Sequence, residues 1–467
     1  MGFKLLIDGK LVDGHATMPV INPATEEVVS PCPIASLDQL EEAIDGAARA
    51  FKTWKHTTLA ERRDVLLKIA DKIDENAEEL ARLLTSEQGK PLADAAIEVA
   101  SISAFCRYFQ TLDMPVEILE ENDAQRVEIH RMPLGVVGAI VPWNFPLVLL
   151  GFKLPPALLA GNTIIIKPAP TTPLTTLRLG EIIADVAPAG VINIIADAND
   201  LGGVISSHPK IAKVSFTGST ATGAKVMASA ASTLKRITLE LGGNDAGIIL
   251  DDVNVEEIAP KIFQGAFGNN GQICIAMKRV YAHASIYDQL CSELAKLADG
   301  AIVGDGSEQG TQLGPLQNKM QYDKVREFLE DGKQNGTVIA GGTVDDSKGY
   351  FIRPTIIRDI SDGTRLVDEE QFGPVLPIIK YDDVNDVIDR ANNSPYGLGG
   401  SVWSTDVERA YEVAKQVESG TVWVNKHADL APHIPFGGSK TSGIGAELGH
   451  EGLQEFTQRK VINVALS

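Results

Sequence analysis

Short apolar runs and helix-like stretches alternate along the chain from about residue 135 onward, a rhythm that few folds can accommodate. The apolar runs are rich in β-branched residues and cover positions 136–141, 163–166, 191–195, 214–217 and 236–239. Stretches with a helical pattern lie between them, at 147–159, 174–185, 201–207 and 221–231. This order predicts a buried parallel sheet with crossover helices. Such sheets bind ligands at the carboxyl ends of their strands.

A second series of the same kind follows. Strands are predicted at 279–283, 337–340, 375–381, 400–403 and 421–424, and helices at 259–267, 288–298, 320–333 and 405–417. The pattern therefore predicts two α/β domains that divide near Gly242-Gly243. A chain of 467 residues, 44% of them apolar, is long enough to bury two cores.

Nearer the N-terminus, the pattern is helical. A capping box from Ser36 to Gln39 predicts the start of an amphipathic helix that reaches Trp54, and more helix is expected from about 58 to 84. Two segments, 115–131 and 457–467, read as extended pieces outside both domains. We expect them to pair as added strands, within the subunit or with a neighbouring one.

Charge and cysteine content exclude several classes of function. The formal net charge of −20 argues against nucleic acid or an anionic membrane as partner. The longest apolar run, 134–150, is broken by Pro142 and Pro146, and no signal peptide is recognisable. Four scattered cysteines without a C-x-x-C pair suggest neither a zinc site nor a disulfide framework. Free thiols fit a reducing compartment, so a cytoplasmic location is expected.

One cysteine stands in a setting that suits a nucleophile. Cys274 follows a turn through Asn270-Gly271, where the backbone can bend sharply and leave the thiol open to a ligand. A carboxylate held nearby, for which Glu240 is the candidate, could deprotonate the thiol or a water molecule. An unselected cysteine is more often a small buried hydrophobe. The assignment therefore depends on the surrounding motifs.

The predicted sheet edge carries two features that suit a phosphate or a ribose. The turn from Gly218 through Ser219 to Gly223 follows a predicted strand and opens a helix, so its backbone N–H groups can approach a phosphate. Lys167 ends another strand of the same sheet. Each feature has a plainer reading, as an ordinary turn and as a solvated edge lysine. Their position at one edge favours a dinucleotide.

Seven motifs, taken in order, resemble the signatures of the NAD(P)-dependent aldehyde dehydrogenase superfamily. They are V-P-W-N-F-P at 141–146, K-P at 167–168, F-T-G-S at 216–219, E-L-G-G at 240–243, G-Q-I-C at 271–274, E-Q-F-G-P at 370–374 and P-F-G-G at 435–438. The resemblance runs from about residue 5 to the end of the chain. It implies an α/β fold with a Rossmann-type cofactor domain at 1–114 and 132–242, a catalytic domain at 243–445, and oligomerisation β-segments at 115–131 and 446–467.

The resemblance also implies a mechanism that needs no metal. Cys274 matches the thiol that adds to the aldehyde, and Asn144 matches the amide that stabilises the resulting oxyanion. Glu240 matches the general base that activates water to hydrolyse the thioester. Glu447 falls where many members carry a second, proton-relaying glutamate, and Lys153 falls on the lysine that supports the relay.

Ligand-binding residues follow from the same match. The NAD or NADP site is expected to comprise Val141, Pro142, Trp143, Lys167, Gly218, Ser219, Gly223, Leu241, Gly242, Glu370 and Phe372. The aldehyde pocket is expected to be apolar, lined by Phe145, Leu149, Phe152, Ile273, Ile275 and Phe436. A loop at 425–434 would form its lid. Lys426 and His427 on that loop could pair with an acidic aldehyde, although solvent exposure is the expectation we favour.

The chain departs from the family pattern at the adenosine ribose. NAD-preferring members often have a glutamate two residues after the K-P motif, and Pro170 stands there instead. Pro170 cannot accept the ribose hydroxyls and carries no charge to repel a 2′-phosphate. Binding of both dinucleotides, with NADP tolerated and NAD still usable, is therefore expected.

Three other functions remain open at this point. A CoA-acylating relative usually lacks the glutamate at the position of Glu240, and a non-catalytic structural paralogue would lose the thiol of Cys274. A cysteine hydrolase would need a histidine partner, and no histidine lies in the matched motifs. An aldehyde dehydrogenase that acts as a homodimer or homotetramer is the reading we favour.

Overall fold

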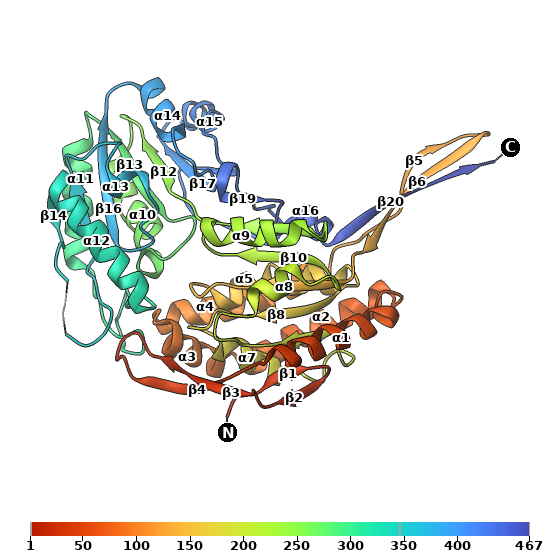
Figure 1. Cartoon of the computed structure of the whole chain (residues 1–467). Coiled ribbons are helices and arrows are strands. Elements are labelled where there is room, and N and C mark those ends of the chain that lie inside the picture. The colour runs from red at the N-terminus through yellow and green to blue at the C-terminus, as the bar shows by residue number, and fades with distance from the viewer. Residues whose placement is uncertain (1, 345–346, 467) are drawn as a thin grey trace.

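Five runs of β-branched residues form the parallel centre of an eight-stranded sheet, as the sequence predicts (Figure 1). The protein is seen in a computed structural model that describes residues 2–344 and 347–466. Along the sheet the parallel strands are β11 (Arg236–Glu240), β10 (Ile211–Thr217), β7 (Val136–Ile140), β8 (Thr163–Lys167) and β9 (Ile192–Ile194). Antiparallel edge strands extend it, β1 (Leu5–Ile7) and β2 (Lys10–Val12) beside β9 and β19 (Gly443–Ile444) beside β11.

Helices from the first half of the chain cover this sheet. They are α1 (Leu37–Trp54), α2 (Leu59–Glu75), α3 (Ala77–Gln88), α4 (Leu92–Phe109), α5 (Pro146–Gly151), α6 (Leu154–Leu159), α7 (Leu174–Ile182), α8 (Gly202–Ser207) and α9 (Thr220–Ala231). The predicted capping box is present, because the Ser36 hydroxyl accepts the Gln39 N–H and the Gln39 side chain accepts the Ser36 N–H. A two-stranded ribbon, β3 (Ala16–Ile21) with β4 (Val28–Ile34), precedes α1.

The single helix expected at 147–159 is in fact two helices. Pro155 and Pro156 stand in the first turn of α6, and neither has a backbone N–H to donate to the preceding turn. The chain therefore ends α5 at Gly151 and starts a new helix at Leu154. The helix expected from 58 to 84 is likewise divided at Asn76, between α2 and α3.

The second series of strands forms a separate seven-stranded sheet. Its order is β14 (Thr337–Ala340), β15 (Thr355–Arg358), β16 (Val375–Tyr381), β13 (Met277–His283), β12 (Asp245–Ile249), β17 (Gly399–Trp403) and β18 (Thr421–Val424). All pairs are parallel except β14 with β15. The strands β12 and β15 were not among those predicted. Two hydrophobic clusters pack on this sheet, apart from the cluster of the first sheet.

Helices again connect the strands of the second sheet. They are α10 (Val255–Phe267), α11 (Tyr287–Gly300), α12 (Lys319–Asn335), α13 (Arg365–Asp368), α14 (Val384–Asn392) and α15 (Val407–Ala414), with a 3₁₀ turn at η1 (Gly268–Gly271). After the last strand of this sheet, the 3₁₀ turn η2 (Lys440–Ser442) precedes β19, and α16 (Gly449–Gln454) follows β19 and contacts α6. The turn η1 follows α10 directly and leads into the segment that carries Cys274.

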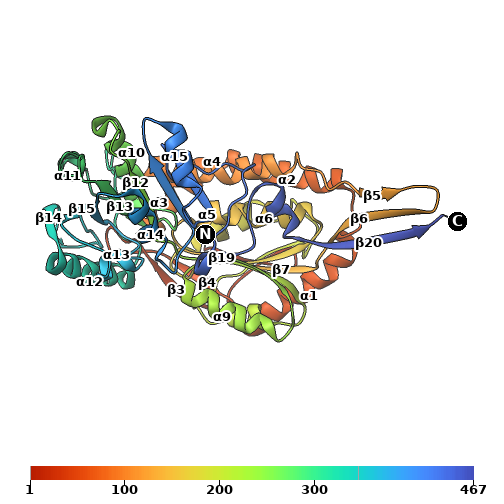
Figure 2. The ribbon, with the colours of Figure 1, turned by 90° about the horizontal axis from the view of Figure 1, so that it is seen from above.

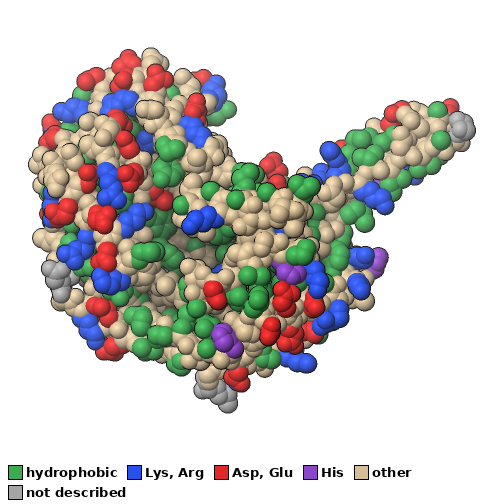
Figure 3. Space-filling model, viewed as in Figure 1, with side chains coloured by type: hydrophobic (Ala, Val, Ile, Leu, Met, Phe, Trp, Pro, Cys, Tyr) green, Lys and Arg blue, Asp and Glu red, His purple; other side chains and the backbone are tan. Residues whose placement is uncertain are grey.

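Three strands leave the body as a long arm, which both ribbon views show (Figures 1 and 2). The arm has the antiparallel order β20 (Thr457–Ala465), β6 (Gln125–Pro133) and β5 (Glu117–Glu121), and β20 pairs with β6 along its whole length. The two extended segments thus pair within the subunit. Hydrophobic side chains lie along the arm (Figure 3), and Leu119 and Val461 are 55% and 54% exposed. Among the described residues, no helix combines the length and apolar composition that crossing a bilayer requires.

Candidate active site

A tight left-handed turn presents Cys274. Asn269, Asn270 and Gly271 have φ angles of 48°, 56° and 75°, a conformation that asparagine and glycine adopt more readily than other residues. At Gly271 a side chain would collide with the carbonyl of Gly373, so glycine is required there. The turn leaves Cys274 partly accessible, whereas Cys32, Cys106 and Cys291 are buried.

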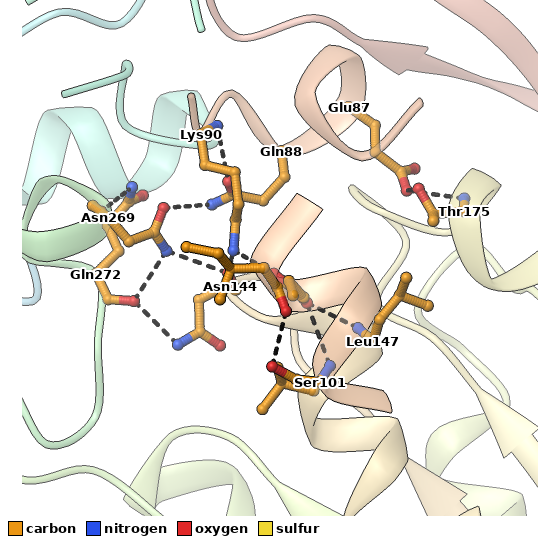
Figure 4. A network of polar contacts seen from close by, with 12 residues as sticks. Glu87, Gln88, Lys90, Ser101, Asn144, Leu147, Thr175, Asn269 and Gln272 are labelled. Carbon is orange, nitrogen blue, oxygen red and sulfur yellow. Dashed lines mark hydrogen bonds and ion pairs between the residues drawn. The ribbon is translucent and has the colours of Figure 1, made fainter. Parts of the chain in front are cut away.

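Asn144 reaches the same turn from the first sheet. Its side chain is buried, and Nδ2 donates to the Gln272 carbonyl at 3.0 Å. In return, Asn269 Nδ2 donates to the Asn144 carbonyl at 3.1 Å (Figure 4). These contacts hold the amide against the segment that leads to Cys274. Because an amide nitrogen has two N–H groups, one of them remains to bind a ligand.

A buried ion pair between Lys90 and Glu98 holds the backbone of Asn144. Lys90 Nζ donates to the Asn144 carbonyl at 3.0 Å (Figure 4). It also pairs with Glu98, and both charged side chains are almost fully buried. Glu98 Oε1 also accepts the Leu147 N–H at 2.9 Å, at the start of α5. The Lys90 ammonium lies 3.6 Å from the centre of the Phe145 ring. Sequence analysis did not identify Lys90 or Glu98.

Glu240, the last residue of β11, is a buried carboxyl group. Neither of its oxygens has a hydrogen-bond partner among the described residues, so both remain available to a ligand or water. Burial raises the pKa of Glu240 well above its usual value, and the neighbouring Glu447 carboxylate raises it further. Burial likewise raises the pKa of the Cys274 thiol, and the charge of Glu240 adds to that shift. The thiol is therefore protonated at neutral pH in this arrangement.

Lys153 and Glu447, the expected relay pair, form a fully buried ion pair. Lys153 Nζ also donates to Thr217 Oγ1 at 2.7 Å, and Ser215 Oγ donates to Glu447 Oε1 at 3.2 Å. The backbone of Glu447 pairs with Phe436 through two hydrogen bonds of 2.7 Å. The pair lies close enough to Glu240 for both charges to act on its pKa.

Most of the residues expected to hold the dinucleotide lie at the carboxyl ends of β7, β8, β10 and β11. Ser219 caps α9, and Gly218 N–H donates to the Glu240 carbonyl at 3.0 Å. A side chain at Gly223 would collide with Leu241, so glycine lets α9 approach that residue. The N-terminus of α9 therefore lies beside the end of β11, in a position that a phosphate can approach.

Across from this turn, a second group of expected cofactor residues comes together. Glu370 Oε1 accepts the Gly243 N–H at 3.0 Å, and a Cβ atom at Gly242 would lie 2.6 Å from Glu370 Oε2. Trp143 and Phe372 stack edge to face with ring centres 5.4 Å apart. These contacts join the first sheet to the second at the expected nicotinamide end. The N-terminus of α9, the Glu370 carboxylate and this aromatic pair suit a dinucleotide.

The six expected pocket residues belong to one hydrophobic cluster or pack against it, and Cys274 packs against the same cluster. Phe145 and Ile273 are partly exposed, and the other four, Leu149, Phe152, Ile275 and Phe436, are buried. Phe152 stacks on Phe105 at 5.2 Å. The group is apolar throughout.

The expectation that Lys426 and His427 are both exposed is wrong for His427. Lys426 is exposed and pairs with Asp429 at 2.6 Å. The His427 side chain is only 1% exposed, because its ring lies between the Ile275 carbonyl at 2.7 Å and the Ser401 hydroxyl at 3.0 Å. Burial lowers the pKa of His427 to about 4. The imidazole is therefore neutral at pH 7 and offers no charge to an acidic aldehyde.

Comparisons with known proteins find relatives along almost the whole chain. The model of the aldehyde dehydrogenase family matches residues 11–462. A mitochondrial aldehyde dehydrogenase of Leishmania tarentolae is 40% identical over 471 residues, covering 99% of this chain and 95% of the relative. A phenylacetaldehyde dehydrogenase of Pseudomonas fluorescens is 37% identical over 99% of this chain and 96% of its own. The structure of a Bacillus cereus aldehyde dehydrogenase in complex with NAD+ superposes with a TM-score of 0.97, at 38% identity over 100% of this chain and 97% of that one.

Proposed function

The chain belongs to the aldehyde dehydrogenase family, and we propose that it oxidises an apolar aldehyde to the carboxylic acid with NAD(P)+ through covalent catalysis by Cys274. One observation carries the proposal. The accessible thiol lies on a turn that also holds the Asn144 amide, and the unpartnered carboxyl of Glu240 is close enough to act on the pKa of that thiol.

The first step is addition of the thiol to the carbonyl carbon. The sulfur forms the new bond, the carbonyl π electrons move to oxygen, and the thiol proton leaves toward a base such as Glu240. The free N–H of Asn144 and the Cys274 N–H stabilise the oxyanion. Because Asn144 is held by its own contacts before the substrate arrives, little reorganisation is needed.

A dinucleotide held at this site would supply the acceptor for the hydride that leaves the former aldehyde carbon, and loss of that hydride leaves a thioester on Cys274. Glu240 then takes a proton from water, the water oxygen attacks the thioester carbon, and the Cys274 sulfur departs with the acid released. Lys153 and Glu447 supply a buried route that carries the proton away from Glu240. A hydrolytic final step, rather than transfer to CoA, follows from the presence of this carboxylate.

Replacement of Asn144 by alanine is expected to lower kcat by about 10²- to 10³-fold, because an oxyanion donor acts mainly in the transition state. The KM for aldehyde should change little. Steady-state kinetics on the variant measure both. A kcat within threefold of wild type would show that Asn144 does not stabilise the oxyanion.

Replacement of Glu240 by glutamine is expected to slow thioester hydrolysis by about 10²- to 10⁴-fold while acylation continues. Stopped-flow absorbance should then show a burst of about one NAD(P)H per active site, followed by slow turnover. Glu42→Gln, an equivalent change on the exposed face of α1, serves as control. In the wild type, hydrolysis should weaken as pH falls through the raised pKa of Glu240, since the protonated carboxyl is no base. Slow turnover without a burst would place the defect before the thioester.

The reaction itself is tested by the absorbance of NADH and NADPH with short aliphatic, aromatic, hydroxy- and carboxy-aldehydes. Reduction that needs no CoA supports the proposed function, and aromatic or longer aliphatic aldehydes should be preferred because the expected pocket is apolar. Reduction only in the presence of CoA would indicate an acylating enzyme. No reduction under any condition would leave a structural role.

Assembly and location extend the proposal. We propose a homodimer or homotetramer in which the arm of β5, β6 and β20 contacts a second copy, since exposed apolar side chains such as Leu119 and Val461 lie on it. We also propose a cytoplasmic location, which suits an enzyme whose four cysteines are all free and whose thiol must stay reduced.

A further inference from the structure

Two buried side chains of opposite charge meet at the carboxyl ends of neighbouring parallel strands. Lys167 ends β8, Asp197 follows β9, and Lys167 Nζ lies 2.6 Å from Asp197 Oδ1. Their side chains are 4% and 0% exposed. Asp197 Oδ2 also accepts the Leu201 N–H at 2.8 Å, which fixes the carboxylate from its other side. The pair therefore belongs to the edge of the sheet at which we propose that the dinucleotide binds.

The hydrogen bonds of Lys167 leave one of its three N–H groups available to a ligand atom. Its ammonium group has three N–H donors, of which one binds Asp197 and a second reaches the Pro168 carbonyl at 3.3 Å. The third can donate to a ribose hydroxyl. Its positive charge, however, is already compensated by Asp197. Lys167 therefore suits a neutral hydroxyl better than a phosphate dianion.

Asp197 also changes the cofactor preference that Pro170 alone predicts. In open α/β sheets, a carboxylate near a strand end accepts the ribose hydroxyls of NAD, whereas a free cation accommodates the 2′-phosphate of NADP. With Pro170, the end of β8 lacks the carboxylate that a glutamate would provide there. Asp197, which follows the neighbouring strand β9, supplies a carboxylate instead, and this carboxylate contacts Lys167. Asp200 of the same loop is exposed, so solvent screens its charge. Pro170 taken alone predicts tolerance of NADP, because it carries no charge to repel a 2′-phosphate.

We propose that Asp197 is the residue that sets cofactor specificity, by holding Lys167 for the adenosine ribose and by cancelling the positive charge that would otherwise attract a 2′-phosphate. The inference rests on the proposed function and deepens it, because it selects NAD over NADP. A free cation a few ångströms from a phosphate at a partly buried site attracts it strongly enough that loss of this attraction produces discrimination on the order of 100-fold.

Binding of the two dinucleotides to the full-length protein, measured by isothermal titration calorimetry without aldehyde, tests the proposal independently of turnover. The wild type should bind NADP+ about 100-fold more weakly than NAD+. Asp197→Asn keeps the shape and an acceptor for the Leu201 N–H, and should reduce this ratio at least about tenfold, mainly by tightening NADP+. Asp197→Glu keeps the charge and should retain a ratio above about ten.

Asp200→Asn is the matched control, since it removes the same charge from the same loop without a contact to Lys167. It should leave the ratio within about threefold of wild type, because an exposed charge is screened by solvent. A wild type that binds both dinucleotides equally well overturns the inference, even if no variant folds. So does an unchanged ratio in Asp197→Asn. In both cases NAD+ still binds and the proposed function stands, whereas a protein that binds neither dinucleotide overturns both.

Discussion

Cys274→Ala is expected to abolish aldehyde-dependent formation of NAD(P)H, with a loss greater than about 10⁴-fold. In the proposed mechanism the sulfur forms the bond that makes the aldehyde carbon a hydride donor, and alanine leaves no atom to replace it. The partner residues Asn144 and Glu240 act on an adduct that would no longer form. Their contributions should therefore disappear together with the thiol, and Cys274→Ala/Glu240→Gln should be no slower than Cys274→Ala alone.

The matched control for this experiment is Cys291→Ala, which removes a buried thiol of α11 that packs in a different hydrophobic cluster. It should retain activity within about threefold, since the change is small and Cys291 takes no part in the proposed chemistry. Cys274→Ala should also bind NAD+ like the wild type, which separates lost chemistry from lost folding. Alkylation by iodoacetamide, followed by mass spectrometry, should label Cys274 first, since it is the partly accessible cysteine among the four. Activity of Cys274→Ala within tenfold of wild type would rule out covalent catalysis by this residue.

Much of the fold could be predicted because both sheets are largely parallel and buried on both faces. Such strands are continuous runs of β-branched residues, which stand out in sequence. The strand β12 was missed because it departs from this pattern. Its first three residues, Asp245-Ala246-Gly247, disfavour strands. Asp245 can lie there because Gly399 donates its N–H to the carboxylate at 3.0 Å, a contact across 154 residues of chain. Local pattern cannot reveal a partner so far away.

The candidate site was predicted unevenly. Residues that carry the chemistry lie in motifs and could be named, whereas the residues that support them could not. His427 looked like an exposed charge because polarity was the only local signal, and its burial depends on the Ile275 carbonyl and Ser401 hydroxyl. Glu98 did leave a signal. It lies on the buried face of α4, next to Ala95 and Val99, and a carboxylate on a buried face requires a partner.

That partner is Lys90, and its replacement is expected to cause a large loss of stability. Lys90→Met keeps the length of the side chain but leaves Glu98 buried without its counter-ion, and breaking a buried pair in this way typically costs about 3–5 kcal/mol. Urea unfolding followed by tryptophan fluorescence measures the loss. The Asn144 carbonyl also loses a donor, so kcat should fall in the surviving folded protein while NAD+ binding persists.

Two comparisons show whether burial of the charge is the cause of this loss. Arg82→Met breaks an exposed pair with Glu78 on α3, and should cost less than about 1 kcal/mol because solvent screens it. Lys90→Met/Glu98→Leu removes both charges, and should recover part of the stability lost in Lys90→Met, since no unpaired carboxylate remains. Recovery of stability without recovery of kcat would show that the pair positions Asn144 as well as stabilising the fold. A Lys90→Met variant as stable as Arg82→Met would contradict the idea that this ion pair supports the site.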